Sequence, residues 1–229
     1  MRRRELLAGG AAVAATYAVS SGSEEPPAKL VPPDKGTMPV AFVISSGATM
    51  IDFTGPWEVF QDCQVEGRGA EGTVFELFTV AETAEAVRVT GGMKVVPDFT
   101  VDNAPQPRVI VVPAHRSTPR LRDWIVKASE KTDLTMSVCT GAFALAKAGM
   151  LKGRAATTHH DFQDRLASEF PDVTVRRGLR FVESGRIATA GGLTSGIDLA
   201  LRVVERYFGR EVAQTTATYM EYQSTGWRA

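Results

Sequence analysis

The chain has 229 residues, of which 44% are hydrophobic and 23% are charged, with 26 basic and 26 acidic side chains. This composition predicts a globular protein with enough residues for one α/β domain, and it gives no basic surplus of the kind that drives nucleic-acid binding. Two cysteines, Cys63 and Cys139, are too few for a disulfide scaffold, and no Cys-x-x-Cys or His-x-x-x-His spacing indicates a structural metal.

The first 23 residues are expected to be a targeting signal. Arg2, Arg3 and Arg4 precede a short apolar run and then the small residues 20–23. This order is typical of a secretory signal, and Arg3-Arg4-x-Leu-Leu resembles a twin-arginine signal. We therefore expect export to the periplasm or the exterior by that route. The run is too short to span a bilayer comfortably, although an uncleaved anchor stays open.

The rest of the chain is expected to be a linker followed by a single domain. Residues 24–37 contain four prolines, which forbid a helix and favour extended backbone. The folded domain is expected over residues 38–229.

Strand and helix patterns alternate along this domain. The first half predicts strands at 38–45, 73–80, 109–112 and 134–138, a hairpin within 86–97, and helices opening near 54 and over 119–129. The second half predicts a helix after Cys139, further helices over 161–168, 194–208 and 211–222, and short strands at 173–175, 179–182 and 187–190. This alternation predicts an α/β fold with a largely parallel sheet and helices on both faces.

Cys139 is the first candidate for chemistry. The run Ser137-Val138-Cys139-Thr140-Gly141 leads from a short apolar strand directly into a helix. A side chain on so tight a turn stands above the edge of the sheet, and the N–H groups of the following helix favour the thiolate form. The pattern indicates a nucleophile, and a buried, inert cysteine is the alternative.

Two residues at other strand ends are candidate proton partners for Cys139. Asp52 lies among apolar neighbours, which raises the pKa of a carboxylate, so it could hold or pass a proton. Alternatively, it caps the helix expected near Gly55. His115 follows residues 112–114, and it would either form a dyad with Cys139 or lie exposed in a loop.

Other polar motifs are expected to be structural. His159 and His160 are adjacent, and adjacent histidines do not easily chelate one ion, so packing and hydrogen bonding are expected for them. The run 191–198, Gly-Gly-Leu-Thr-Ser-Gly-Ile-Asp, could bind an anion through backbone N–H groups, but close helix packing is favoured because the spacing of nucleotide-binding loops is missing. Cys63 is expected to be buried and inert.

Taken together, four motifs in order resemble the ThiJ/PfpI family over residues 38–223. They are Asp-Phe-Thr-Gly-Pro at 52–56, Ser-Val-Cys-Thr-Gly at 137–141, Ala-Thr-Thr-His at 156–159 and Ala-Gly-Gly-Leu-Thr-Ser-Gly-Ile-Asp at 190–198. The resemblance implies a flavodoxin-like, doubly wound fold of the class I glutamine amidotransferase type. Within the family, the motifs are most similar to those of isocyanide hydratases and of the amidase-like domains of AraC-type regulators.

The resemblance also implies a chemistry and an assembly. Cys139 would be the nucleophile that attacks an isocyanide carbon, Asp52 its acidic neighbour, and Thr140 a hydrogen-bonding residue that tunes the site. Catalysis would need no metal or organic cofactor, the substrate would be a small molecule, and a homodimer would be usual. No nucleic-acid partner is expected, and no membrane contact beyond an uncleaved signal.

Two departures from the family pattern bear on this expectation. Pro113-Ala114-His115 stands where the family often has Pro-Gly-Gly, so His115 would narrow or re-polarise the pocket. Thr140 stands where the peptidase-like branch has histidine, which disfavours protease activity. Two alternatives to the hydratase stay open: a non-catalytic ligand sensor, and a thiol redox or carbonyl-stress protein that uses Cys139.

Overall fold

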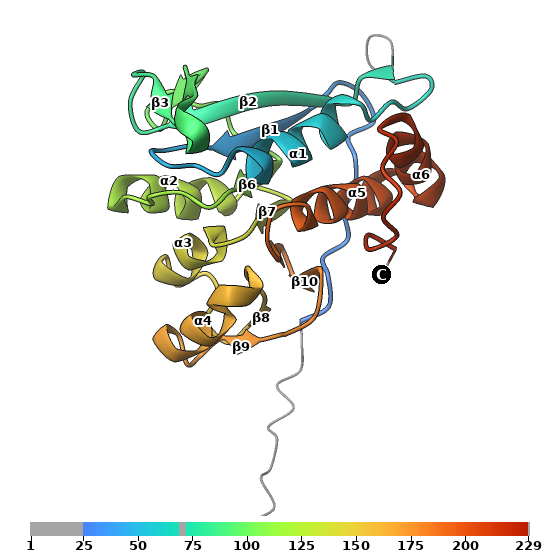
Figure 1. The fold of residues 1–229 in the computed structure, drawn as a ribbon. Helices are drawn as coiled ribbons and strands as arrows, with labels where there is room; N and C mark the ends of the chain where they lie inside the picture. The colour runs from blue at the N-terminus through green and yellow to red at the C-terminus, as the bar shows by residue number, and fades with distance from the viewer. Residues whose placement is uncertain (1–24, 69–71, 229) are drawn as a thin grey trace, which may run out of the picture.

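The computed structural model describes residues 25–68 and 72–228, and a seven-stranded sheet forms its centre (Figure 1). The strand order is β10-β11-β7-β6-β1-β2-β5, and every neighbouring pair is parallel except β10 with β11. The strands in that order are β10 (Phe181–Ser184), β11 (Ile187–Ala190), β7 (Leu134–Ser137), β6 (Val109–Val112), β1 (Met38–Val43), β2 (Phe75–Ala81) and β5 (Phe99–Thr100). The predicted fold class, a largely parallel sheet in an α/β protein, is confirmed.

Helices cover both faces of the sheet, as the alternating pattern predicts. One core cluster joins the sheet to α1 (Met50–Gln61), α5 (Ser195–Phe208) and α6 (Arg210–Tyr219). The other cluster joins it to α2 (Pro119–Ser129), α3 (Gly141–Lys147) and α4 (Gln163–Glu169). In β1, Val40 and Phe42 belong to the first cluster and Val43 to the second, because successive side chains of a strand point to opposite faces.

Smaller elements lie outside the main sheet. The predicted hairpin is confirmed as β3 (Val87–Arg88) paired antiparallel with β4 (Lys94–Val95), and the turn η2 (Thr90–Gly92) joins them. Gly91 and Gly92 adopt positive φ angles of 71° and 84° there, which glycine tolerates without a steric penalty. A second pair, β8 (Ala155–Ala156) with β9 (Thr174–Val175), is parallel, and η3 (His160–Phe162) precedes α4.

The prediction that the first helix opens near Thr54 is wrong, because α1 begins at Met50. Proline is commonest in the first turn of a helix, which placed the expected start just before Pro56. The structure instead holds Pro56 inside α1, where proline removes one backbone donor but the rest of the helix continues. Asp52 consequently lies within the first turn of α1 and is not a cap for a helix starting at Gly55.

The proline-rich segment before β1 is packed against the domain, and we name residues 25–37 the N-terminal strap. Residues 25–33 form neither helix nor strand, residues 34–36 are a bend, and Leu30 is buried. Arg108 donates to the carbonyl of Val31 (2.9 Å), and Arg68 to that of Pro33 (2.7 Å). Where the domain begins stays a prediction, but this segment is held by the domain.

The predicted signal, residues 1–23, lies outside the described residues. Among the described residues, no helix has the length and apolar character needed to cross a membrane.

Candidate active site

Cys139 lies on a strained turn between β7 and α3. Its φ angle is +57°, a left-handed conformation that residues other than glycine adopt rarely. Two bonds hold the peptide groups of the turn: the Cys139 N–H donates to the carbonyl of Gly191 (2.8 Å), and the Thr158 hydroxyl donates to the Cys139 carbonyl (2.8 Å). Strain that its surroundings maintain in this way is a feature of functional sites.

The turn requires a glycine two residues after the cysteine. A Cβ atom at Gly141 would lie 2.1 Å from the Val112 carbonyl oxygen and 2.8 Å from that of Pro113. These oxygens belong to the backbone and cannot rotate away, so only glycine allows α3 to approach the end of β6 this closely. Glycine at this position therefore has a defined steric cause.

Asp52 is completely buried beside this turn. Its Oδ2 atom accepts a hydrogen bond from the Ala114 N–H (3.1 Å), whereas Oδ1 is buried without a partner of full hydrogen-bond geometry among the described residues. Burial raises the pKa of Asp52 to about 6, although the Ala114 N–H, the Cys139 side chain and the Leu193 N–H each favour the charged form. The carboxyl group can therefore change its charge near neutral pH.

The expectation that the following helix makes Cys139 a thiolate is wrong for the free protein. Burial, and secondarily the negative charge of Asp52, raises the pKa of the Cys139 thiol to about 11. The N–H groups of Thr140 and Leu193 oppose this rise, but they do not outweigh it. Cys139 is 8% exposed, and at neutral pH it carries its proton.

Thr140 contacts the sulfur with two groups, since both its backbone N–H and its side chain stabilise the charged form of Cys139. It is also the first residue before α3, although its hydroxyl makes no capping hydrogen bond there. This placement is compatible with the tuning role that the family resemblance implies, and the role itself stays a prediction.

Leu193 lies in the run 191–198, for which the sequence left anion binding by backbone N–H groups open but favoured close helix packing. It adopts a φ angle of +53°, and its N–H group stabilises the charged forms of both Asp52 and Cys139. The side chain of Leu193 is 44% exposed, so the backbone, not the side chain, faces the acid and the thiol. The run therefore supplies a backbone donor to this site, although the sequence favoured a packing role for it.

His115 does not join Cys139 in a dyad. Its Nδ1 atom lies 2.8 Å from the Pro113 carbonyl oxygen, so Nδ1 carries the proton and Nε2 is left as a buried acceptor without a partner among the described residues. Burial, aided by the charge of Arg122 and opposed by the hydrogen bond to the Pro113 carbonyl, lowers the pKa of His115 to about 4. The prediction of an exposed loop histidine is also wrong, because the ring is largely shielded.

A cavity of about 330 Å³ is lined in part by the Leu193 loop. Three residues line both the cavity and the surroundings of Cys139 or Asp52: Thr158, Gly191 and Leu193. The loop that carries Leu193 therefore borders both the cavity and the Cys139 site. The remaining lining residues are His159, His160, Gln163, Gly178, Leu179, Arg180, Gly192, Thr194 and Ser195.

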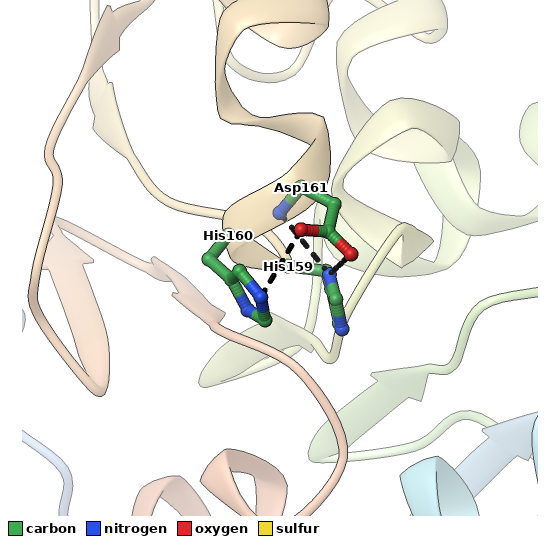
Figure 2. A group of neighbouring side chains, drawn as sticks. All are labelled: His159, His160 and Asp161. Atoms are coloured by element: carbon green, nitrogen blue, oxygen red, sulfur yellow. Dashed lines mark hydrogen bonds and ion pairs between the residues drawn. The ribbon is translucent and has the colours of Figure 1, made fainter.

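The other residues discussed from sequence are the second cysteine and the pair of histidines. Cys63 is fully buried, and burial raises its pKa to about 12, as expected for an inert cysteine. His159 packs on the backbone of Gly192, where a Cβ atom would lie 2.2 Å from the ring. His160 and Asp161 lie next to it at the surface (Figure 2).

The motifs, the strained cysteine and the parallel sheet agree with a match to the model of the DJ-1/PfpI family over residues 38–206. The chain belongs to the DJ-1/PfpI family. Solved structures with this fold include a ThiJ/PfpI family protein from Pseudomonas syringae, at a TM-score of 0.72 and 24% identity over 83% of this chain and 77% of that one. Drosophila melanogaster DJ-1beta matches at a TM-score of 0.70 and 17% identity over 82% of this chain and all of that one.

Curated relatives of this DJ-1/PfpI member differ in activity. Isonitrile hydratase of Pseudomonas putida is 29% identical over 80% of this chain and 78% of its own length. The transcriptional regulator GbdR of Pseudomonas aeruginosa is 26% identical over 84% of this chain, which spans about half (53%) of the regulator. DJ-1alpha of Drosophila melanogaster is 27% identical over 82% of this chain and 85% of its own length.

Proposed function

We propose that the protein is a cofactor-independent enzyme that hydrates an isonitrile to an N-substituted formamide, with Cys139 as nucleophile. The observation that carries the proposal is the strained Cys139 turn beside a buried carboxyl group whose pKa is raised to about 6. The likeness to isonitrile hydratase along most of both chains supports the choice of substrate class.

In the first step, the Cys139 sulfur bonds to the terminal carbon of R–N≡C. The thiol proton passes to Asp52, which is ionised above pH 6, and from there to the same carbon. The product is a thioimidate, R–N=CH–S–Cys139. Because the thiol stays protonated until the substrate arrives, Asp52 has to act as its base, and the Thr140 and Leu193 N–H groups stabilise the sulfur as its charge develops.

In the second step, water adds across the C=N bond, its hydroxyl to carbon and its proton to nitrogen. The adduct R–NH–CH(OH)–S–Cys139 then expels the sulfur, which regains the hydroxyl proton through Asp52, and R–NH–CHO is released. One isonitrile and one water give one formamide, and the protein returns to its starting protonation state.

Replacing the nucleophile provides the direct test. We expect Cys139→Ala to reduce isonitrile turnover by roughly 10⁴-fold or more, because the covalent route is lost, while the melting temperature stays close to that of the wild type. Formamide production is measured by NMR, and mass spectrometry of the wild type during turnover looks for an adduct on Cys139. Wild-type turnover by Cys139→Ala would refute the mechanism.

Replacing the acid tests the second half of the proposal. Asp52→Asn removes the base, so we expect the rate to fall by about 10²–10⁴-fold. In the wild type, kcat/KM is expected to rise with pH through about 6, where Asp52 ionises. A profile without that limb, or a wild-type rate in Asp52→Asn, would limit Asp52 to a structural role.

A non-catalytic sensor is the second candidate, and the similarity to GbdR over 84% of the chain favours it. This function predicts that a metabolite raises the melting temperature without being converted. A redox role for Cys139 has less support, since a buried thiol with a raised pKa reacts slowly with peroxide. Export through a twin-arginine signal and a homodimeric assembly remain parts of the proposal that rest on sequence and family alone.

A further inference from the structure

We propose that His159, His160 and Asp161 form a binding site for a divalent transition-metal ion, separate from the Cys139 site (Figure 2). One ligand atom from each residue lies within 4.8 Å of the other two. Among the described residues, this is the group of His, Cys, Asp and Glu side chains whose ligand atoms converge in this way.

The distances suit a single ion. His160 Nε2 lies 3.1 Å from Asp161 Oδ1, and His159 Nδ1 lies 3.7 Å from Asp161 Oδ2. A tetrahedral ion with bonds of 2.0–2.2 Å places its ligand atoms roughly 3.4 Å apart. The two observed distances bracket that value, although they involve different oxygens of the Asp161 carboxylate. The exposed His160 ring would rotate out of its stack with His159, so that both imidazoles direct an in-plane lone pair at one ion.

The backbone explains why neighbouring histidines lie side by side here. His159 is extended (φ −49°, ψ 136°), and η3 starts at His160, so the chain turns between the two residues. Their rings are stacked, with centroids 4.4 Å apart and an angle of 25° between the planes. Adjacent histidines are not expected to converge on regular backbone. Here the backbone changes from extended at His159 to helical at His160, so that expectation no longer applies.

Both imidazoles present nitrogen atoms that a metal can use. His159 Nδ1 accepts a hydrogen bond of 3.3 Å from the Asp161 N–H, so this nitrogen is unprotonated and its lone pair points toward the cluster. His160 Nε2 faces the carboxylate, and an ion would replace the proton between them. Binding breaks the hydrogen bond to His159 Nδ1, the His160–Asp161 contact and the stacking of the two rings, and three bonds to the metal replace them.

One ligand is held in place and the other two can adjust. The His159 side chain is 20% exposed and packs between Gly192 and Phe162, whose ring lies edge-on at 5.8 Å. The His160 and Asp161 side chains are 79% and 67% exposed. Both histidines line the cavity beside the Leu193 loop, which leaves room for water or a ligand at the remaining coordination positions.

The ligand set and its charge favour particular ions. Two imidazoles and one carboxylate suit Zn²⁺, Ni²⁺ or Cu²⁺ better than Ca²⁺ or Mg²⁺, which prefer oxygen. Arg180 also lines the cavity, but its charge is paired with the buried Asp198 at 2.5 Å. The Asp161 carboxylate is therefore available to an incoming cation.

Calorimetric titration of the untagged, metal-free protein with Zn²⁺ tests the site. We expect one ion to bind per chain, and we expect His160→Ala and Asp161→Asn each to weaken binding by at least about tenfold. Both substitutions affect exposed side chains, so folding is expected to survive, which circular dichroism checks. Titration with Co²⁺ adds a spectroscopic readout, because nitrogen and oxygen ligation lacks the charge-transfer absorption of a thiolate.

Two matched variants locate the ion. Asp164→Asn removes an exposed carboxylate three residues further on, which pairs with Arg177, and Cys139→Ala removes the thiol of the Cys139 site. Both are expected to bind Zn²⁺ like the wild type. Loss of binding in Cys139→Ala, unchanged binding in both cluster variants, or no saturable binding up to about 1 mM would overturn the proposal.

Discussion

At the scale of single residues, Cys139 and Asp52 share one negative charge at neutral pH. Burial disfavours the charged form of each group, and the charge on Asp52 further opposes ionisation of the thiol. The carboxyl has the lower pKa and takes the charge, while the sulfur keeps its proton. In the proposed hydratase, reactivity therefore has to come from proton transfer during substrate attack and not from a standing thiolate.

Two buried residues are predicted to make opposite contributions to the pH dependence of folding. The pKa of Asp52 is raised from 3.8 to about 6, so the native state binds its proton more tightly, and stability falls by about 3 kcal/mol as pH rises from 4 to 6. The pKa of His115 is lowered from 6.5 to about 4, so stability rises by a similar amount between pH 4 and 6.5. The two slopes nearly cancel in the wild type.

Single substitutions separate these contributions. In Asp52→Asn, where the His115 contribution remains, stability is expected to rise as the pH increases from 4 to 6.5. His115→Asn keeps a donor near the Pro113 carbonyl. In this variant, where the Asp52 contribution remains, stability is expected to fall as the pH increases from 4 to 6. Urea denaturation at a series of pH values measures the free energy of unfolding. If the Asp52→Asn curve ran parallel to that of the wild type, the Asp52 carboxyl would have an ordinary pKa and the proton-transfer argument would fail.

At the scale of elements, the loop before α5 brings a backbone donor to the reacting pair. The Arg180 carbonyl accepts from the Gly191 N–H (2.9 Å), and the Arg180 guanidinium donates to Thr194 (3.1 Å) and to Asp198. Asp198 is fully buried and also accepts from the Ser224 hydroxyl (2.9 Å). Arg180 and Asp198 together hold both ends of the loop that carries Leu193.

Asp198→Asn is therefore expected to loosen the Leu193 loop and to act on Asp52 from a distance. The rate is predicted to fall by roughly tenfold, and the acid limb of the kcat/KM profile should move above pH 6, because the Leu193 N–H no longer stabilises the Asp52 charge. Arg180→Lys, which keeps the charge, should shift the limb less. If Asp198→Asn lowered the rate without shifting the acid limb of the kcat/KM profile, Asp198 would have only a structural role.

Sequence patterns predicted the elements but not the conformations that form the site. Buried strands such as Val109–Val112, and helices with clear periodicity such as Pro119–Ser129, appear at the predicted positions. The two-residue strands β5 and β8 are too short to show a period, and Pro56 hid the true start of α1. Cys139 and Asp52 could be named as candidates because their side chains are titratable, whereas Leu193 contributes a backbone N–H group, and the sequence favoured helix packing over anion binding for its run.

At the scale of the whole molecule, the Cys139 site and the N-terminal strap lie at opposite ends of the strands of the sheet. Cys139 follows the carboxyl end of β7, where ligands bind in open parallel sheets. The strap, blue in Figure 1, crosses the amino ends of the strands: Val31 meets Arg108 just before β6, and the Ala28 N–H donates to Gly185 before β11 (2.8 Å). Because the strap enters at the amino ends of the strands, it leaves the carboxyl ends, where Cys139 lies, clear.

This separation predicts that removing the strap weakens the fold but spares the chemistry. A chain that starts at residue 38 loses the buried side chain of Leu30 and the arginine contacts to the carbonyls of Ala28, Val31 and Pro33. We expect a loss of roughly 2–5 kcal/mol, seen as a melting temperature lower by about 5–15 °C than that of a chain starting at residue 25.

Leu30→Ala, which keeps the hydrogen bonds of the strap, is expected to account for about 2 kcal/mol of that loss, since it removes one buried aliphatic side chain. The turnover of both variants should match the wild type at a temperature where they are folded, because the residues that hold the strap, among them Arg68, Arg108 and Arg206, do not belong to the Cys139 site. An unchanged melting temperature would show that the strap adds no stability. A change in turnover of the folded variants would show that the strap at the amino ends of the strands is coupled to the Cys139 site at their carboxyl ends.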